Sequence, residues 1–241
     1  MNNKAQGIIL SVSDYRDNDL ICQVLFKEYG LLSIVAKGAK KITSKNAYSL
    51  LPASLSEMLF DYKDHKTIFT LKSANLIHSY YQDNDILKIT GLGLILDITK
   101  HAMVGNDNIN DIYDVLLDAL RYSETNDIVH VLAIYLARMA KIIGISPYVD
   151  GCVKCNESKV VTISKVDGGF LCIKHAINLP KYEVEVLKKF RLINKMNFEH
   201  INLLSDISYS YQDLDYMADF FIQNSFINIK SYNFFRTILR K

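Results

Sequence analysis

The sequence predicts an α+β protein with two domains, a small five-stranded barrel followed by a mainly α-helical domain that carries a zinc-binding segment. Short segments rich in β-branched residues fill the first eighty residues, and helical spacing of apolar residues begins after about residue 82. Paired cysteine and histidine residues interrupt the helical part. We expect domains at 1–80 and 81–241, with the zinc-binding segment at about 148–180. The chain has 241 residues and a hydrophobic content of 49%, which is sufficient for proper cores.

Five β-strands are predicted in the N-terminal domain, and turn residues such as Tyr29-Gly30 separate them. The longest connection joins the third and fourth strands, where a barrel of the OB type commonly carries an extended loop or helix. This pattern favours an OB barrel, although a small meander or sandwich would also fit it. The predicted strands are 7–12, 20–26, 31–36, 54–62 and 67–73.

The helical domain is predicted from apolar residues at a helical period. The first segment is apolar on most faces, so we expect a buried helix there. No internal repeat or Pro/Gly-rich linker separates the two domains, so we expect them to pack directly on each other. The predicted helices are 86–98, 112–120, 128–143, 184–193, 214–223 and 233–239.

A C-x2-C pair and a C-x2-H pair, separated by sixteen residues, are typical of a structural zinc site. Four nitrogen and sulfur ligands fill the tetrahedral shell of zinc and leave no position for substrate. A strand at 160–164 and a turn at Asp167-Gly168-Gly169 would fold the second pair back onto the first. The alternative is a set of reduced, buried cysteines beside an incidental histidine. The predicted ligands are Cys152, Cys155, Cys172 and His175, and the remaining Cys22 is expected in the core.

Composition and motifs exclude several classes of protein. No apolar run reaches the eighteen or so residues that span a bilayer, and the polar start lacks the layout of a signal peptide, so we expect a cytoplasmic protein without membrane attachment. Walker, G-x-S-x-G, H-E-x-x-H and dinucleotide-binding patterns do not occur. The sequence therefore predicts no catalytic site.

Basic residues are concentrated in two segments of a chain whose net charge is only +2. No acidic residue lies between Tyr29 and Ser56, and four lysines occur there beside Tyr48. Lysines on a loop suit backbone phosphates, and a tyrosine can stack on an unpaired base, although a solvated loop would show the same composition. The candidate nucleic-acid contacts are Arg16, Lys37, Lys40, Lys41 and Lys45, with Lys230 and Arg236 near the C-terminus.

Several segments, in this order and spacing, resemble the RecO family of bacterial DNA repair and recombination mediators. They are 7–17, 29–40, Gly144-Ile145-Ser146-Pro147 leading into the first cysteine pair, and 230–235. The resemblance spans essentially the whole chain. Members commonly use four cysteines for zinc, whereas this chain has His175 in the last place.

The resemblance implies a non-enzymatic mediator with an OB fold, a helical domain and structural zinc. It implies binding to single- and double-stranded DNA, annealing of complementary strands, and cooperation with RecR in loading RecA onto strands coated by single-strand-binding protein (SSB), in the cytoplasm at the nucleoid. The acidic, apolar tail of SSB is an expected ligand of the helical domain. The alternatives are an RNA-binding or RNA-modifying protein that uses the barrel for docking, and a scaffold that binds only proteins.

Overall fold

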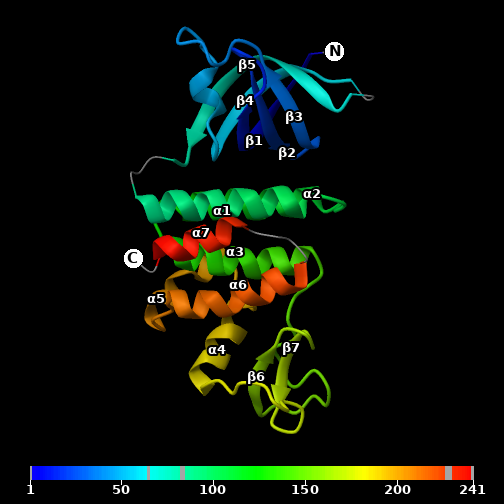
Figure 1. Cartoon of the computed structure of the whole chain (residues 1–241), viewed down its shortest axis with the longest axis vertical. Coiled ribbons are helices and arrows are strands. Elements are labelled where there is room, and N and C mark those ends of the chain that lie inside the picture. Colours follow the sequence, from blue (N-terminus) through cyan, green and yellow to red (C-terminus); the bar gives the residue numbers. More distant parts are fainter. Residues whose placement is uncertain (1, 64–65, 82–84, 226–229, 240–241) are drawn as a thin grey trace. The chain divides into compact units, whose positions relative to one another are not determined.

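A computed structural model describes residues 2–63, 66–81, 85–225 and 230–239 of the chain (Figure 1). It contains an N-terminal five-stranded barrel, α-helices and a small two-stranded sheet, which confirms the predicted fold class. By its internal contacts the chain divides into two compact units, 1–124 and 125–241. The first unit contains the barrel and two helices.

The barrel is closed, with its strands in the order β1-β2-β3-β5-β4. Strands β3 and β5 pair in parallel, and the other neighbours pair antiparallel. Five strands in this non-sequential order form the Greek-key barrel of the OB type. The strands are β1 (Asn2–Asp14), β2 (Leu20–Phe26), β3 (Gly30–Ala36), β4 (Ser54–Asp61) and β5 (Ile68–Ser79).

Barrel closure depends on the long strand β1, which pairs with β4 along its first half and with β2 along its second half. Gly7 pairs with both neighbours, and a Cβ atom added there would lie 2.5 Å from Val24 Cγ1. Glycine is therefore favoured here, because a larger residue would collide with the buried side chains of Val24 and Phe26 on β2. Inside the barrel, Phe60 is fully buried, and its ring centroid lies 5.0 Å from that of Phe26.

Helices α1 (Ile86–Ala102) and α2 (Ile109–Tyr122) complete the first unit. The side chain of Asp85 caps α1 by accepting a hydrogen bond from the backbone N–H of Leu87 at 2.8 Å. Lys27, in the turn between β2 and β3, donates to Asp114 of α2 at 2.7 Å and so links the barrel to this helix. Among the described residues, no helix is long and apolar enough to cross a membrane.

The second unit is built around α3, in which twelve of the fifteen residues are buried. Helix α3 packs against α6, and the sheet of β6 and β7 packs against α4. Such a helix, apolar on almost all sides, is typical of the centre of a helical domain. The elements are α3 (Ile128–Ile142), β6 (Val160–Ser164), β7 (Gly169–Cys172), α4 (Val184–Ile193), the 3-10 helix η2 (Phe198–His200), α5 (Asn202–Asp206), α6 (Tyr211–Ser225) and α7 (Lys230–Leu239).

Candidate metal centre and nucleic-acid interface

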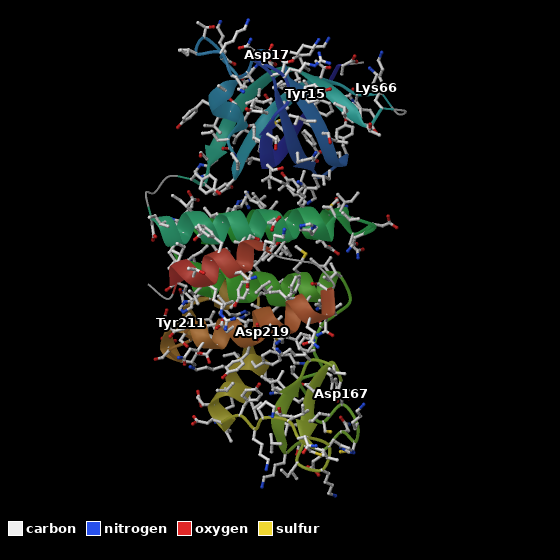
Figure 2. All side chains as sticks on the ribbon, in the orientation of Figure 1. Tyr15, Asp17, Lys66, Asp167, Tyr211 and Asp219 are labelled. Carbon is white, nitrogen blue, oxygen red and sulfur yellow. The ribbon has the colours of Figure 1, made fainter. Side chains whose placement is uncertain are left out.

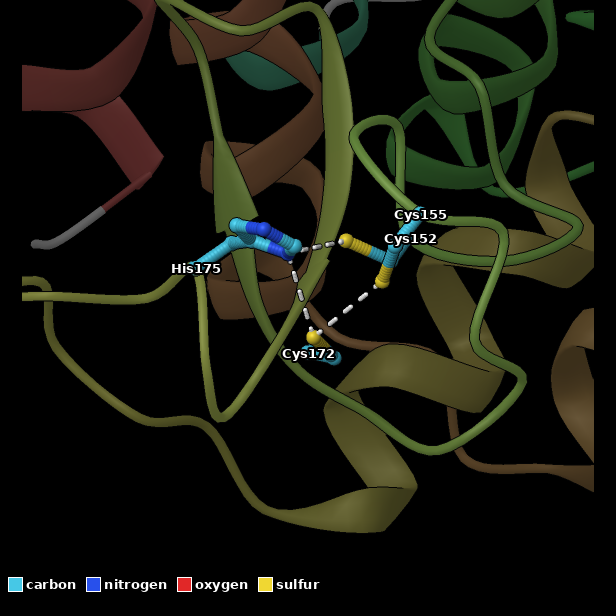
Figure 3. Close-up of side chains that lie close together, drawn as sticks. All are labelled: Cys152, Cys155, Cys172 and His175. Atoms are coloured by element: carbon cyan, nitrogen blue, oxygen red, sulfur yellow. Dashed lines mark hydrogen bonds between the residues drawn. The ribbon is translucent and has the colours of Figure 1, made fainter.

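The four predicted ligands converge beside the β6–β7 sheet, in the knuckle, which we define as residues 148–180 (Figure 3). Their ligand atoms all lie within 4.8 Å of one another. His175 Nδ1 is 3.4 Å from the sulfur atoms of both Cys152 and Cys172, and the Cys155 and Cys172 sulfur atoms are 3.7 Å apart. The structure thus brings together residues that are up to twenty-three positions apart in the sequence.

The backbone around each pair forms a tight turn. The N–H of Asn156 donates to the carbonyl of Cys152 at 2.8 Å, and Asn156 itself has a positive φ of 60°. The N–H of His175 donates to the carbonyl of Cys172 at 3.0 Å. Each turn places its two ligand side chains on the same side, which explains why a spacing of two residues is needed within each pair.

A close backbone contact fixes the turn between β6 and β7. Tyr148 forms a parallel bridge with Gly169, and the N–H of Phe170 donates to the Tyr148 carbonyl at 3.0 Å. A Cβ atom at Gly169 would lie 2.3 Å from that carbonyl oxygen. Only glycine fits this position, so the Gly168-Gly169 pair predicted as a turn also anchors the first part of the knuckle.

The thiol groups differ in acidity because their surroundings differ. Burial raises the pKa of Cys152, but hydrogen bonds from the backbone N–H groups of Cys172, Lys154 and Cys155 outweigh burial, and the pKa falls to about 6. In the barrel, burial raises the pKa of Cys22 to about 12. Metal ligation requires the thiolate. Cys22 therefore behaves as a core residue, as predicted. The Cys152 thiol has a lowered pKa, so it more readily forms the thiolate that binds a cation.

The observed distances fit a tetrahedral ion. With zinc bonds of about 2.3 Å to sulfur and about 2.0 Å to nitrogen, the tetrahedron has edges of about 3.8 Å between sulfur atoms and about 3.5 Å between sulfur and nitrogen. The measured separations of 3.7 and 3.4 Å agree with both values. The Cys3His cluster is therefore suited to hold a metal ion, and a tetrahedral ion bound by all four ligands would have no open position, so it would support structure and not catalysis.

The lysine loop, which we define as residues 37–51, follows β3 at one end of the barrel. Its four lysines are exposed, and the 3-10 helix η1 (Ala47–Leu50) forms its second half. The β1–β2 turn binds the beginning of this loop. Lys40 Nζ pairs with Asp14 at 2.7 Å, and the N–H of Gly38 donates to Asp19 at 2.8 Å.

Arg16 lies in the same β1–β2 turn, so the structure places it beside the beginning of the lysine loop. It is exposed, and its guanidinium carbon stacks over the Tyr15 ring, 5.2 Å from the centroid. Figure 2 shows the side chains of Tyr15 and Asp17 projecting from this end of the barrel. Asp14 and Asp19, which lie close to Arg16 in the sequence, both bind the lysine loop.

The two C-terminal candidates differ in their surroundings. Lys230 is exposed at the start of α7. Arg236 pairs with Asp215 of α6 at 2.9 Å, and Tyr232 donates to the same carboxylate at 2.5 Å. Arg236 therefore holds α7 against α6.

Sequence reasoning missed a pocket of about 480 Å³ in the second unit. It lies at the C-terminal end of α3, where Arg138 and Lys141 line it together with the more distant Lys195. The one lining acid, Asp150, pairs with Lys195 at 2.7 Å and with Arg191 at 2.9 Å. Polar residues such as Ser146 and Asn194 and apolar residues such as Pro147 and Met196 complete the lining, so the pocket is basic and of mixed polarity. The pocket could not be predicted from the sequence, because its lining comes from two segments, 137–150 and 194–196, that are far apart in the chain.

An OB-type barrel with a basic loop, joined to a helical part with a Cys3His cluster, is an arrangement typical of multidomain proteins that bind nucleic acids. The comparisons give the particular family: the N-terminal domain of recombination protein O matches residues 1–80, and the C-terminal domain of recombination protein O matches residues 83–224. The chain belongs to the RecO family of DNA repair and recombination proteins, which act as mediators and not as enzymes.

Curated relatives agree with the family. DNA repair protein RecO of Bacillus cytotoxicus is 28% identical over 210 residues, which cover 84% of this chain and 82% of the relative. The RecO protein of Halalkalibacterium halodurans is 26% identical over 211 residues, covering 85% and 82% respectively. That of Bacillus mycoides is 28% identical over 189 residues, covering 77% and 75%.

Proposed function

We propose that this chain is a DNA-binding recombination mediator. It binds single- and double-stranded DNA through the barrel, anneals complementary strands and, with RecR, helps to load RecA onto strands coated by SSB. In this proposal 1–80 is the DNA-binding domain, 81–241 is the helical domain, and the protein acts in the cytoplasm at the nucleoid. The observation that carries the proposal is the exposed lysine loop beside Arg16 on an OB-type barrel.

The charge distribution supports phosphate binding at this end of the barrel. Lys37, Lys41 and Lys45 are exposed, as is Arg16 in the adjoining turn. Exposed cations on one surface attract the DNA backbone without reading its sequence, which suits a protein that anneals any complementary pair. Lys40 is already paired with Asp14, and in this proposal it contacts DNA from within that ion pair. The exposed Lys230 of the second unit is a further proposed DNA contact. Arg236 is paired with Asp215, so its proposed contribution to DNA binding is indirect: it keeps α7 in place.

Binding of a fluorescent single-stranded oligonucleotide across a salt series tests this proposal. Each phosphate contact adds about −0.7 to the slope of log affinity against log salt. The double substitution Lys41→Ala, Lys45→Ala should flatten the slope by about one unit or more and slow annealing of an SSB-coated complement. The matched control is Lys100→Ala, Lys188→Ala, which removes two exposed lysines elsewhere. An equal effect of both pairs would refute the loop assignment.

We propose zinc as the resident metal because three thiolates and an imidazole are the ligands it prefers. Bound zinc would supply folding energy to the knuckle. Metal analysis of the purified chain should give about one equivalent of zinc, and less than about half an equivalent would count against zinc.

The basic pocket at the end of α3, whose lining is partly apolar, is our proposed site for the SSB tail. Its lining carries three cations and one acid, and it includes the buried residues Ala137 and Met196. A short acidic peptide with an apolar end complements such a lining. Lys141→Glu should weaken binding of a fluorescent tail peptide, whereas Lys188→Glu on α4 should not. Equal binding by all three proteins would exclude this pocket.

The RNA alternative uses the same barrel and predicts a different preference. An RNA strand of the same sequence should compete no better than DNA if the mediator proposal holds. Stronger binding to RNA, or turnover that one substitution abolishes, would favour the alternative.

A further inference from the structure

Ile42 occupies the tip of the lysine loop and makes no contribution to the core. The N–H of Ser44 donates to the carbonyl of Lys41 at 2.9 Å, which closes a β-turn with Ile42 as its first central residue. The Ile42 side chain is fully exposed. Turn positions favour glycine, proline, asparagine, aspartate and serine, each for a conformational reason that isoleucine lacks. Local structure therefore does not explain this residue.

The surroundings of Ile42 restrict what could cover it. Lys40 and Lys41 precede it and Lys45 follows it, and no acidic residue occurs between Tyr29 and Ser56. Because Asp14 already pairs with Lys40, the cations that a partner of this tip would meet are Lys41 and Lys45, and an anionic partner with apolar surface complements them and Ile42. Unpaired or unstacked bases offer their faces beside a chain of phosphates, so a nucleic acid satisfies both requirements.

We propose that Ile42 is a wedge that inserts between adjacent bases of the bound DNA while Lys41 and Lys45 contact the flanking phosphates. Isoleucine is among the apolar side chains that enter base steps in this way and partly unstack them. This inference rests on the proposed DNA binding and adds a mechanical role to it. Because unstacking a base step costs free energy that offsets part of the gain from the new contact, we expect the wedge to change the structure of the DNA more than its affinity.

The test uses oligonucleotides that contain 2-aminopurine, whose fluorescence is quenched while the base is stacked. Saturating wild-type protein at low salt should raise the fluorescence. Ile42→Ser should lose this rise while it still binds the DNA, and Ile42→Leu should restore the rise. Val104→Ser, which removes an exposed apolar side chain after α1, is the matched control and should keep it. The Lys41→Ala, Lys45→Ala protein should regain the rise once it is saturated.

Each of the following outcomes would contradict the proposed insertion of Ile42 between bases. A rise that Ile42→Ser retains would overturn it, and wild-type binding without any rise would overturn it while leaving the proposed function intact. Absence of DNA binding in every protein would remove both. If Ile42→Ser instead abolished binding to vesicles of anionic phospholipid and left the DNA signal unchanged, the tip would be a membrane contact.

Discussion

The barrel and the knuckle are both small β structures, but different forces stabilise them. The barrel core contains fourteen buried residues, including Phe26, Phe60 and Phe69. The buried cluster of the knuckle contains four residues, and two of these are the ligands Cys152 and Cys172. Burial of apolar surface can stabilise the barrel without any ligand. Because the knuckle has so small a cluster of its own, we expect a bound metal ion to supply much of its stability.

Loss of metal from the knuckle should change the protein more than any other change considered below. Cys155→Ser removes an exposed ligand, so zinc content should fall from about one equivalent to near zero, and proteolysis should cut within 148–180. Structural zinc binding supplies about 10 kcal/mol or more in small metal-dependent domains. Cys22→Ala is the matched control, because this cysteine lies in the barrel and should leave zinc content unchanged. Retention of zinc by Cys155→Ser would contradict the ligand assignment.

Truncation of the barrel core should have a smaller effect, confined to the other region. Phe60→Ala removes a fully buried ring that packs on Phe26 and Tyr29, and should lower the free energy of unfolding by about 3–5 kcal/mol. Chemical denaturation measures this change. Zinc content should stay the same, and Tyr48→Ala, an exposed aromatic control, should alter neither quantity. Loss of zinc on Phe60→Ala would show that the two regions depend on each other.

Substitution of the histidine ligand should have an intermediate effect on the metal alone. His175→Cys should keep about one equivalent of zinc, because four thiolates also complete a tetrahedral site, whereas His175→Ala should lower the affinity. Titration against a colorimetric chelator measures both. Equal affinity in the alanine variant and the wild type would show that His175 is not a ligand.

The smallest expected effect is at the ion pair between the lysine loop and the β1–β2 turn. Lys40 and Asp14 are partly exposed, so Lys40→Ala should change the free energy of unfolding by less than about 1 kcal/mol. A thermal melt of the variant, compared with Phe60→Ala, checks this expectation. A change as large as that of the core variant would mean that the loop is part of the barrel's stability.

Local patterns predicted most of the fold. Strand β6 and helix α4 begin and end at the predicted residues, because each has a clear period and clear turn signals. Strand β1 begins at Asn2, before the predicted 7–12, because pairing with β4 extends it over a polar start that has no strand pattern of its own. The short helices η2 and α5 were missed, since so few residues show no period.

Among the candidate sites, too, those built from residues close together in the sequence could be predicted, and those built from distant residues could not. The Cys3His cluster was predicted because its ligands come in two local pairs whose spacing is itself the signal. The attachment of the lysine loop to Asp14 and Asp19 could not be predicted, because it joins residues nineteen or more positions apart and depends on barrel closure. The pocket at the end of α3 is hidden for the same reason, as Lys195 reaches it from another part of the chain.

The carboxylate of Asp14 has a further consequence for the proposed interface. A DNA phosphate that approaches Lys40 competes with an internal anion 2.7 Å from the same ammonium group. Exchange of one anion for another frees fewer counterions than capture by a bare lysine, so Lys40 adds less to affinity and salt dependence than Lys41 or Lys45. The Asp14 carboxylate thus occupies the position beside Lys40 that a DNA phosphate would take. In the proposed annealing, where a strand is released once its complement has paired, such competition would favour turnover over tight retention.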